Sequence, residues 1–282
     1  MKLKNAAKYF DNDSAYDAYT GGYLFKGQFS TFEGASPDGS FNRRRTVSVA
    51  PEVVAAPRRV VTVQGTSWIM GELIAEGFKD KPIRKSSSAK EVTSLYDLLT
   101  PGQAALRAST GVNRLYGHAT YLKDTVNSLT DSAYDPQYEV TFALTETIQA
   151  GNFLRSPAHF LHIRTVQFAN EGYWIATADE ISVAPKQTSC EVVVEFSGVY
   201  DPITEERATG VTTTGILLDM YKLYKFNTQA DPRNQAGDMS LIVAKSAITP
   251  EPGQELAIAG VIWRNVNFTE YHDAWNIQIR RA

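Results

Sequence analysis

Three segments of the chain share one pattern: a run of β-forming residues, a tight corner that contains glycine, and a tryptophan near the start of a second apolar run. The segments are residues 60–70, 166–176 and 256–266, and their tryptophans are Trp68, Trp174 and Trp263. Strand-forming residues on both sides of a short glycine corner indicate an antiparallel hairpin. None of the three copies carries a catalytic group, so the pattern constrains the fold more than the chemistry.

The spacing of these hairpins indicates separate small β modules. The tryptophans are unequally spaced, at about the size of a small β domain, whereas solenoids and propellers have short, regular periods. At 282 residues, the chain has room for two domains or three small ones. Short strand-like runs with Gly and Pro turns are typical of barrels and sandwiches. We therefore predict a mainly β fold of two to three small antiparallel β-barrel or β-sandwich modules, with an extended N-terminal arm and few short helices.

The predicted arm covers residues 1–57. Turn-forming residues recur there and no helical or strand period persists, yet the segment is rich in tyrosine and phenylalanine. Disordered segments are usually poor in aromatic residues. We expect an extended arm whose rings pack on another surface of the same chain or of a neighbour.

The remaining chain is expected to form three β modules, over residues 58–135, 136–209 and 210–282. The strand signal is strongest near residues 138–145, where apolar and polar residues alternate. One helix is expected over Pro101–Ala108, because Thr100 is a suitable N-cap and proline is favoured at the first helical position. Residues 88–99 fit either a strand or a short helix.

Composition excludes several classes of protein. The net charge of −3 gives no general reason to expect nucleic acid or an anionic membrane as a partner. The single cysteine, Cys190, cannot form an internal disulfide, and we expect it to be a small buried or strand-end residue. The N-terminus lacks the apolar core of a secretory signal, and no stretch has the roughly 20 apolar residues that span a bilayer. We expect synthesis in the cytoplasm.

No motif points to catalysis, a cofactor or a metal. Residues 22–29 have glycines at P-loop spacing, but Gln28 and Phe29 stand where Lys and Ser/Thr belong. His159 and His162 are close in sequence, but residues three apart on a strand face opposite sides. The adjacent acidic pairs, Asp179-Glu180 and Glu205-Glu206, usually mark solvated turns. The paired carboxylates of a glycosidase converge from separate strands, so the sequence alone does not exclude a glycosidase site. We expect no enzyme, no cofactor and no metal.

Part of the sequence resembles structural proteins of tailed bacteriophages. Residues 236–244, residues 249–266 and the terminal Trp275–Arg281 resemble neck and tail-completion proteins, in which a strand leads to a Pro/Gly turn, a glycine corner, an aromatic residue and a last strand ending in arginine. Residues 58–72 and 172–181 are similar to other segments of such proteins. The chain is longer than a single-domain stopper, and Gln254 stands where an acidic residue is common. The resemblance implies a structural virion protein between capsid and tail that forms a ring and catalyses no reaction.

The partners expected from this resemblance are copies of the chain in a ring and neighbouring virion proteins on the portal or adaptor side and on the tail side. Passive contact with packaged DNA is left open by the sequence, membrane contact is not expected, and the expected location is the virion. We expect the aromatic arm and its arginines to form the subunit interface, with Arg43, Arg44, Arg45, Tyr23, Phe25, Phe29, Phe32 and Phe41 as candidates. Deletion of residues 1–45 is then expected to abolish the ring but leave a folded core.

Two alternatives remain. The first is another virion component, such as a tail, baseplate or capsid-decorating protein. The second is a carbohydrate-binding β module of a tail spike, in which Trp68, Trp174 and Trp263 would be exposed near carboxylates or amides. Their position inside apolar runs favours core packing.

Overall fold

The computed structural model describes residues 13–31, 44–53, 59–78, 81–122, 137–181, 191–198, 200–201, 203, 206–219 and 238–282. In these ranges the fold is mainly β, with 21 strands and one short helix. The strands form two closed six-stranded antiparallel barrels and a third antiparallel sheet, besides one small hairpin. This confirms the predicted fold class.

The central barrel closes in the order β10-β13-β12-β11-β8-β9. Its strands are β8 (Ser94–Leu99), β9 (Asn113–Leu122), β10 (Gln137–Ala143), β11 (Phe153–Arg155), β12 (Phe160–Ala169) and β13 (Tyr173–Glu180). The C-terminal barrel closes in the order β14-β17-β18-β21-β20-β19. Its strands are β14 (Glu191–Phe196), β17 (Val211–Asp219), β18 (Met239–Ala244), β19 (Glu255–Ile258), β20 (Val261–Tyr271) and β21 (Ala274–Arg281).

The N-terminal sheet contains β1 (Asp13–Asp17), β2 (Tyr23–Thr31), β3 (Arg44–Val49), β4 (Val60–Val63), β5 (Thr66–Met70), β6 (Ile74–Phe78) and β7 (Lys81–Glu91). Its order is β3-β2-β1-β4-β5-β7-β6, and β3 also pairs with β7, so that the pairings return to the first strand of the series. Both β5 and β6 pair with β7 and follow each other in the chain, so together they take the place of one interrupted strand.

The three units share one strand topology. We number the strands of each unit in chain order and leave out the small hairpin β15–β16. In every unit the pairs are then 1–2, 2–3, 3–6, 6–5, 5–4 and 4–1. The interrupted strand β5/β6 is the fifth strand of the N-terminal sheet. Identical topology in three consecutive units is stronger support for repeated modules than the hairpin pattern, because the pairing order joins strands that are distant in sequence.

A glycine bends the second strand of every unit. Gly27 pairs with both the first and the third strand of its unit, and Gly117 does the same in the central barrel. Gly215 lies at the corresponding place in β17. A Cβ at Gly117 would lie 2.9 Å from the ring of Tyr96 and 3.0 Å from Val140. Absence of a side chain therefore lets the strand curve over the core.

The tryptophans form two equivalent pairs rather than one set of three. Trp68 and Trp263 follow the turn between the fourth and fifth strands, at Gln64-Gly65 and Ala259-Gly260, where both turn residues have positive φ. Trp174 instead follows the turn between the fifth and sixth strands, and Trp275 is its equivalent. All four indoles pack on apolar cores. The prediction that the tryptophans are packing elements is thus confirmed. They lie in two kinds of hairpin, not in one repeated hairpin.

The segment expected to be an arm supplies strands to the N-terminal sheet. Residues 13–49 contain β1, β2 and β3, and Ala15, Phe25 and Val47 from these strands lie in its core. The structural units therefore run from Asp13 to Glu91, from Ser94 to Ile181 and from Glu191 onward, unlike the expected boundaries. Deletion of residues 1–45 would remove strands of the first unit, so it cannot test assembly on an intact core.

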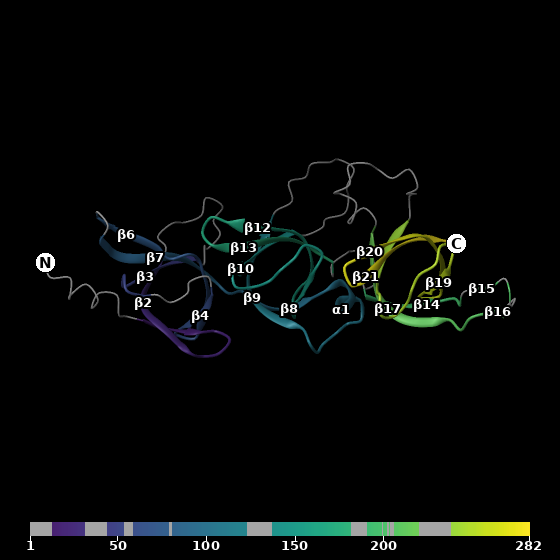
Figure 1. Ribbon diagram of the computed structural model, residues 1–282, viewed down its shortest axis with the longest axis horizontal. Coiled ribbons are helices and arrows are strands. Elements are labelled where there is room, and N and C mark those ends of the chain that lie inside the picture. Colours follow the sequence, from purple (N-terminus) through teal and green to yellow (C-terminus); the bar gives the residue numbers. More distant parts are fainter. Residues whose placement is uncertain are drawn as a thin grey trace.

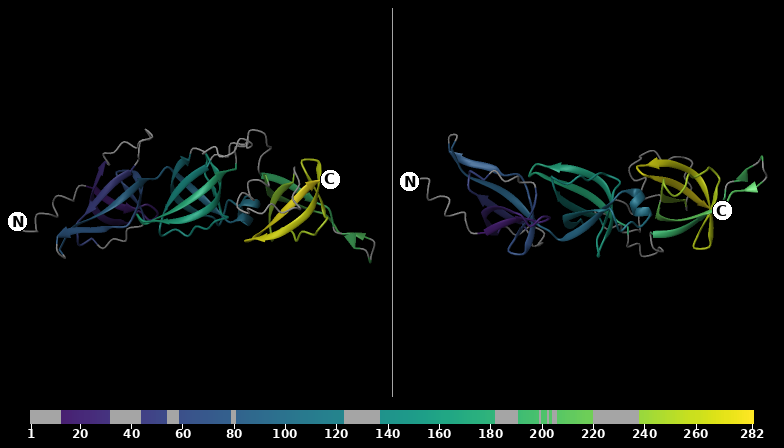
Figure 2. Two further views of the ribbon diagram at one scale, coloured as in Figure 1. Left: turned by 90° about the horizontal axis from the view of Figure 1, so that it is seen from above. Right: turned by 60° about the horizontal axis from the view of Figure 1, so that its bottom comes forward.

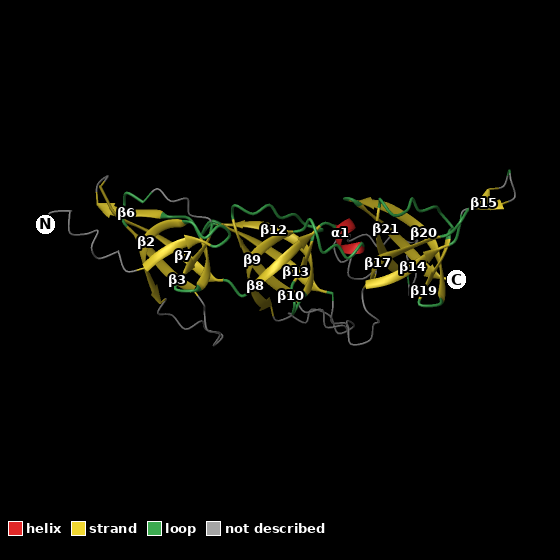
Figure 3. Ribbon diagram, turned by 90° about the horizontal axis from the view of Figure 1, so that it is seen from below, coloured by secondary structure: helices red, strands yellow, loops and turns green. Residues whose placement is uncertain are grey.

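The three units lie in a row in chain order, from the N-terminal sheet to the C-terminal barrel (Figures 1 and 2). Helix α1 (Pro101–Ala105) lies between the central and C-terminal barrels (Figure 3). Its start matches the sequence prediction, with Thr100 as N-cap in a capping box with Gln103. The hairpin of β15 (Tyr200–Asp201) and β16 (Glu206–Arg207) projects at the far end of the row. Among the described elements, no helix has the length and apolar composition needed to cross a membrane.

Candidate functional site

The predicted interface residues occupy different environments. Phe25 and Phe29 are buried in the core of the N-terminal sheet, so their rings are covered by their own chain. Tyr23 is exposed and meets Tyr16 edge to face. The guanidinium of Arg45 lies over the Trp68 ring, 4.7 Å from its centroid. Arg44 belongs to β3, whereas Arg43, Phe32 and Phe41 lie outside the described residues. Of the candidates whose side chains the structure describes, Phe25 and Phe29 thus lie in the core and only Tyr23 is exposed.

The residues considered for chemistry also separate. His159 contacts Glu180, with Nδ1 2.8 Å from Oε2, whereas Nε2 of His162 lies 2.9 Å from the Tyr271 hydroxyl. Asp179 and Glu180 are buried, contrary to the expected solvated turn: Arg164 pairs with Asp179, and the Phe160 amide donates to Glu180. Within the described ranges, no group of three His, Cys, Asp or Glu side chains is placed to hold a metal ion. Cys190 and Glu205 lie outside those ranges.

The closest convergence of side chains from different units occurs at two junctions. At the first, Val60 and Ile69 of the N-terminal sheet share an apolar cluster with Ala143 and Tyr173 of the central barrel. All four are fully or almost fully buried. Burial of this kind is worth about 25 cal/mol per Å² of apolar surface removed from water, so the two units are held together rather than merely tethered.

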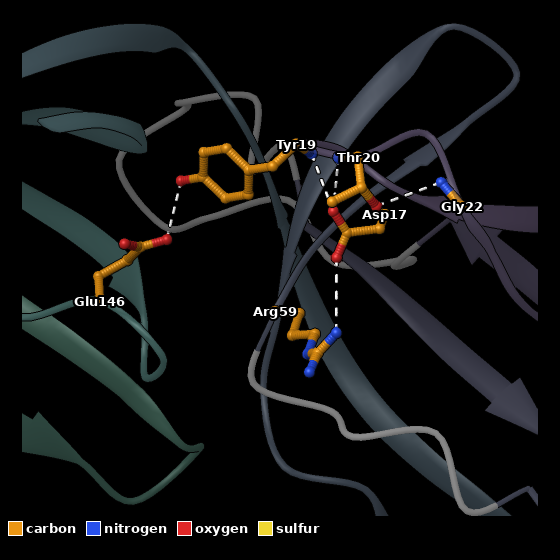
Figure 4. A network of polar contacts seen from close by, with 6 residues as sticks. All are labelled: Asp17, Tyr19, Thr20, Gly22, Arg59 and Glu146. Atoms are coloured by element: carbon orange, nitrogen blue, oxygen red, sulfur yellow. Dashed lines mark hydrogen bonds and ion pairs between the residues drawn. The ribbon is translucent and has the colours of Figure 1, made fainter.

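A polar network borders the first junction (Figure 4). The Asp17 carboxylate accepts the amides of Tyr19 and Thr20 at 3.0 and 2.9 Å and lies 3.6 Å from Arg59. These bonds lower the pKa of Asp17, although its partial burial acts in the opposite direction. The turn that Asp17 holds presents the Tyr19 hydroxyl, which donates to Glu146 of the central barrel at 2.8 Å. Desolvation raises the pKa values of Tyr19 and Glu146, and the phenol–carboxylate bond joins the two units.

Tyr173 is the central side chain of the first junction. It is the first residue of β13, and its hydroxyl donates to the carbonyl oxygen of Ser88 on β7 at 2.6 Å. The ammonium of the buried Lys90 lies 5.4 Å from the centroid of the Tyr173 ring and donates to Thr141 of β10 at 2.8 Å. A polar and an apolar contact therefore converge on one aromatic side chain.

Two glycines permit the backbones to meet at this junction. The Glu72 amide of the N-terminal sheet donates to the Glu171 carbonyl of the central barrel at 2.8 Å. A Cβ at Gly71 would overlap the Glu171 carbonyl oxygen, and a Cβ at Gly172 would lie 2.8 Å from the Glu72 nitrogen. A backbone hydrogen bond between units requires this approach.

At the second junction, the turn before β21 docks beside helix α1. Asp273 accepts the Thr100 hydroxyl at 2.5 Å and the Gly102 amide at 2.9 Å. A Cβ at Gly102 would lie 2.7 Å from the Asp273 carboxylate, so this contact also depends on a glycine. The carboxylate thereby fixes the start of the helix to the C-terminal barrel.

His162 and Tyr271 meet at the same junction. Burial lowers the pKa of His162 to about 4, and the nearby charge of Arg164 acts in the same direction. Burial raises the pKa of Tyr271 to about 12. Both side chains are consequently neutral near pH 7, as an imidazole–phenol hydrogen bond requires. The apolar part of the junction includes Phe153 from the central barrel and Ala274 from the C-terminal barrel.

The two junctions are equivalent. In each, the turn between the fifth and sixth strands of the later unit contacts the start of the fourth strand of the earlier unit. The residue before the bend glycine also acts alike: the Tyr116 hydroxyl donates to the Ala18 carbonyl at 3.4 Å, and the Thr214 hydroxyl donates to the Ala105 carbonyl at 2.7 Å. The same docking geometry is therefore used twice within one chain.

No family model, no curated protein and no solved structure matches this chain. The candidate site is therefore defined by geometry alone. Sequence reasoning did not find the junctions, because their residues are ordinary in local sequence. The available signal was weak: Glu171-Gly172-Tyr173-Trp174 and His272-Asp273-Ala274-Trp275 both place a polar turn just before an equivalent tryptophan.

Proposed function

We propose that this chain is a structural protein of a tailed-bacteriophage virion, located at the head–tail interface and assembled into a ring of identical subunits. The observation that carries the proposal is the row of three topologically equivalent units joined by two closely fitted junctions. Such a row is suited to bearing mechanical load and to presenting surfaces over a long span. In this proposal function lies in assembly, with no turnover of a substrate.

The segments that resemble neck and tail-completion proteins support the proposal by their position. Residues 255–258, 261–271 and 274–281 form β19, β20 and β21, which pair in that order in the C-terminal barrel. These strands lie together in the C-terminal barrel, whereas the similar segments around β4–β5 and β13 belong to the other two units. Neighbouring virion proteins and passive contact with packaged DNA remain the proposed partners.

The sugar-binding alternative receives less support. Trp68 is buried, and Trp174, Trp263 and Trp275 pack against the cores of their barrels. The Trp275 indole donates to the Ile248 carbonyl at 2.9 Å. Sugar-binding platforms need exposed ring faces, so these side chains favour a packing role.

Native mass spectrometry of the full-length protein, combined with negative-stain electron microscopy, tests the proposal. We expect a closed ring with one defined number of subunits. A stable monomer that binds glycans would overturn the proposal, and an open filament would overturn the ring and favour another position in the virion.

A further inference from the structure

Each internal junction joins two recurring parts. We call the turn between the fifth and sixth strands, with one cross-strand residue pair at its base, the docking hairpin. We call the first residue of the fourth strand, with its partner on the fifth strand, the receiving end. The docking hairpins in the junctions are flanked by the pairs Ala169–Tyr173 and Tyr271–Ala274, and the receiving ends are the pairs Val60–Ile69 and Phe153–His162.

The side chains of these parts meet in a similar way at both junctions. The fifth-strand residues His162 and Tyr271 face each other in a hydrogen bond at the second junction, and Ile69 and Ala169 belong to one apolar cluster at the first. The first residue of the fourth strand shares a cluster with the first residue of the sixth strand in both junctions, as Phe153 and Ala274 do. The arrangement predicts which residues would meet if the junction formed again.

Among the described residues, one docking hairpin and one receiving end have no counterpart. The unused hairpin belongs to the N-terminal sheet and joins β6 to β7, at the end of the row opposite to the C-terminal barrel (Figure 1). Lys85 lies opposite Val49, which lies opposite the bend glycine Gly27. In the central barrel, Trp174 lies opposite Phe142, which lies opposite the bend glycine Gly117, so Lys85 and Trp174 are equivalent. The residues just before them, Arg84 and Tyr173, are therefore equivalent as well. Arg84 pairs with Glu76 across this hairpin, whose strands continue beyond the pair to Phe78 and Lys81.

The unused receiving end belongs to the C-terminal barrel. Its pair is Glu255, the first residue of β19, opposite Arg264 of β20. At the internal junctions the equivalent receiving-end residues, Val60, Ile69 and Phe153 among them, are almost completely buried. At the end of the row the side chains of Glu255 and Arg264 are instead 44% and 59% exposed.

Both unused parts carry a glutamate–arginine pair, and their signs are complementary. The two pairs are Glu76–Arg84, 2.5 Å apart, and Glu255–Arg264, 3.5 Å apart. In the arrangement of the internal junctions, Arg264 would face Glu76 and Glu255 would face Arg84. Opposite charges would thus meet at both positions, whereas the reverse placement of either pair would bring like charges together.

We propose that the paired strands β6 and β7 dock on the C-terminal barrel of a second copy of this chain, through Glu76–Arg264 and Arg84–Glu255 ion pairs. Ion pairs suit this contact because both ends must remain soluble before assembly, whereas the internal junctions are permanent and apolar. The hairpin is a ribbon that is marginally stable alone, and its exposed Ile83 adds apolar surface to the contact.

The contact is heterologous, so it closes into a ring when the rotation between copies divides a full turn and otherwise extends as a filament. The inference rests on one feature of the proposed function, namely that copies of this chain associate with one another. It names the surfaces that the proposed ring would use.

Charge reversal tests this contact in the full-length protein, with sedimentation velocity and native mass spectrometry as readouts. Glu76→Arg places two arginines on the hairpin, and Arg264→Glu places two glutamates at the receiving end. Either variant alone sets like charges against each other, and we expect association at least about tenfold weaker than in the wild type. A 1:1 mixture of the two variants should recover assembly, since each supplies the complement of the other.

Arg114→Glu provides the matched control. Arg114 of β9 pairs with Asp97 of β8 at 3.2 Å, and its side chain is 67% exposed, against 59% for Arg264. This variant should assemble like the wild type, and circular dichroism should show all variants folded. High salt should weaken wild-type association, because exposed ion pairs are screened.

The remaining outcomes separate the inferred contact from the proposed ring. A ring unaffected by both reversals, or variants that do not recover on mixing, would overturn the inference and leave the proposed function intact. A filament restored by mixing would support the inference and overturn the ring. A wild-type protein that stays monomeric at high concentration would overturn both.

Discussion

At the scale of single residues, one structural position carries a different side chain, with different contacts, in each of the three units. The fifth-strand residue opposite the start of the fourth strand is Ile69 in the N-terminal sheet, His162 in the central barrel and Arg264 in the C-terminal barrel. Ile69 packs in an apolar cluster, His162 bonds a phenol and Arg264 pairs with Glu255 at the surface. Side-chain chemistry therefore changes with what covers the position, while the backbone stays the same.

His162 makes stability depend on pH. Its pKa is about 4 in the folded protein against an ordinary value of 6.5, so the unfolded chain takes up a proton more readily. The stabilisation is complete above pH 6.5 and is lost as the pH falls toward 4, by at most about 3 kcal/mol at 1.36 kcal/mol per pKa unit. We expect the melting temperature of the wild type to fall more steeply between pH 7 and pH 4.5 than that of His162→Gln.

Thermal unfolding followed by circular dichroism across this pH range provides the measurement. His162→Gln keeps a polar group opposite Tyr271 but removes the titrating ring. The carboxylates that titrate in the same range are common to both proteins, so the difference in slope isolates His162. Equal slopes would contradict the assignment.

Asp179 and Glu180 show what residue-level sequence reasoning could not reach. Adjacent acidic residues usually lie at a solvated turn, yet both are buried at the end of β13. Their partners, Arg164 and His159, come from β12 and from the residue just before it. Because adjacent residues on a strand point to opposite faces, the two carboxylates serve separate contacts that a local reading does not reveal.

At the scale of secondary-structure elements, helix α1 illustrates a prediction that succeeded. Thr100 accepts the Gln103 amide at 3.2 Å, as the N-cap pattern indicated, and the helix is shorter than predicted at its C-terminal end. The contact from Asp273 was not predictable, because it comes from another unit. The local rule placed the helix, and only the tertiary structure assigned it to a junction.

We expect Thr100→Ala to destabilise the protein by about 1–2 kcal/mol, since it removes both the N-cap and the hydroxyl that Asp273 accepts. Thr100→Ser retains the hydroxyl and should recover most of that loss. Urea unfolding of the two variants measures the difference. Equal destabilisation by both would show that the methyl group matters more than the hydroxyl.

The bend glycines explain why β2 was not recognised from the sequence. Phe25 and Phe29 face the core with Gly27 between them, so the inward face of the strand reads as an interrupted apolar pattern. Aromatic residues without a continuous period were therefore interpreted as an arm. The interruption is itself structural, because β2 passes from pairing with β1 to pairing with β3 at Gly27.

Gly117→Ala tests this account of the bend. Its Cβ would lie 2.9 Å from the Tyr96 ring, and overpacking of this kind costs about 1–3 kcal/mol. The control is Gly22→Ala, where the nearest atom is 3.4 Å from the new Cβ and φ is not positive. Urea unfolding should show a clear loss for Gly117→Ala and little change for Gly22→Ala; similar losses would contradict the crowding argument.

At the scale of the whole molecule, the sequence predicted a mainly β fold of two to three small antiparallel units but not the order in which their strands pair. Glycine corners and alternating strands are local signals, and they identified small β modules. The third strand of each unit pairs with the sixth, as β10 does with β13, across residues that contain two other strands. Such non-local pairing leaves no periodic trace, so the common topology and the repeated junction emerged only from the structure.

The junctions also predict how the molecule unfolds. Tyr173 joins two units through its ring in the buried cluster and through its hydroxyl on Ser88. Truncation of a buried aromatic side chain costs about 3–5 kcal/mol, and here much of that loss falls on the contact between the units. We expect the wild type to unfold in one calorimetric transition across the first junction, and Tyr173→Ala to separate the N-terminal sheet as an earlier transition of its own.

Tyr173→Phe is the matched control for that experiment. It removes the hydroxyl that bonds the Ser88 carbonyl at 2.6 Å and lies 2.8 Å from the Ser88 hydroxyl, a loss of about 1 kcal/mol per hydrogen bond, and should keep a single transition at a slightly lower temperature. Units that were merely tethered would melt independently in the wild type, and the alanine variant would then add no new transition. One transition in the wild type that divides in the alanine variant, but not in the phenylalanine variant, assigns the coupling to ring packing. That packing would make the N-terminal sheet and the central barrel one cooperative unit.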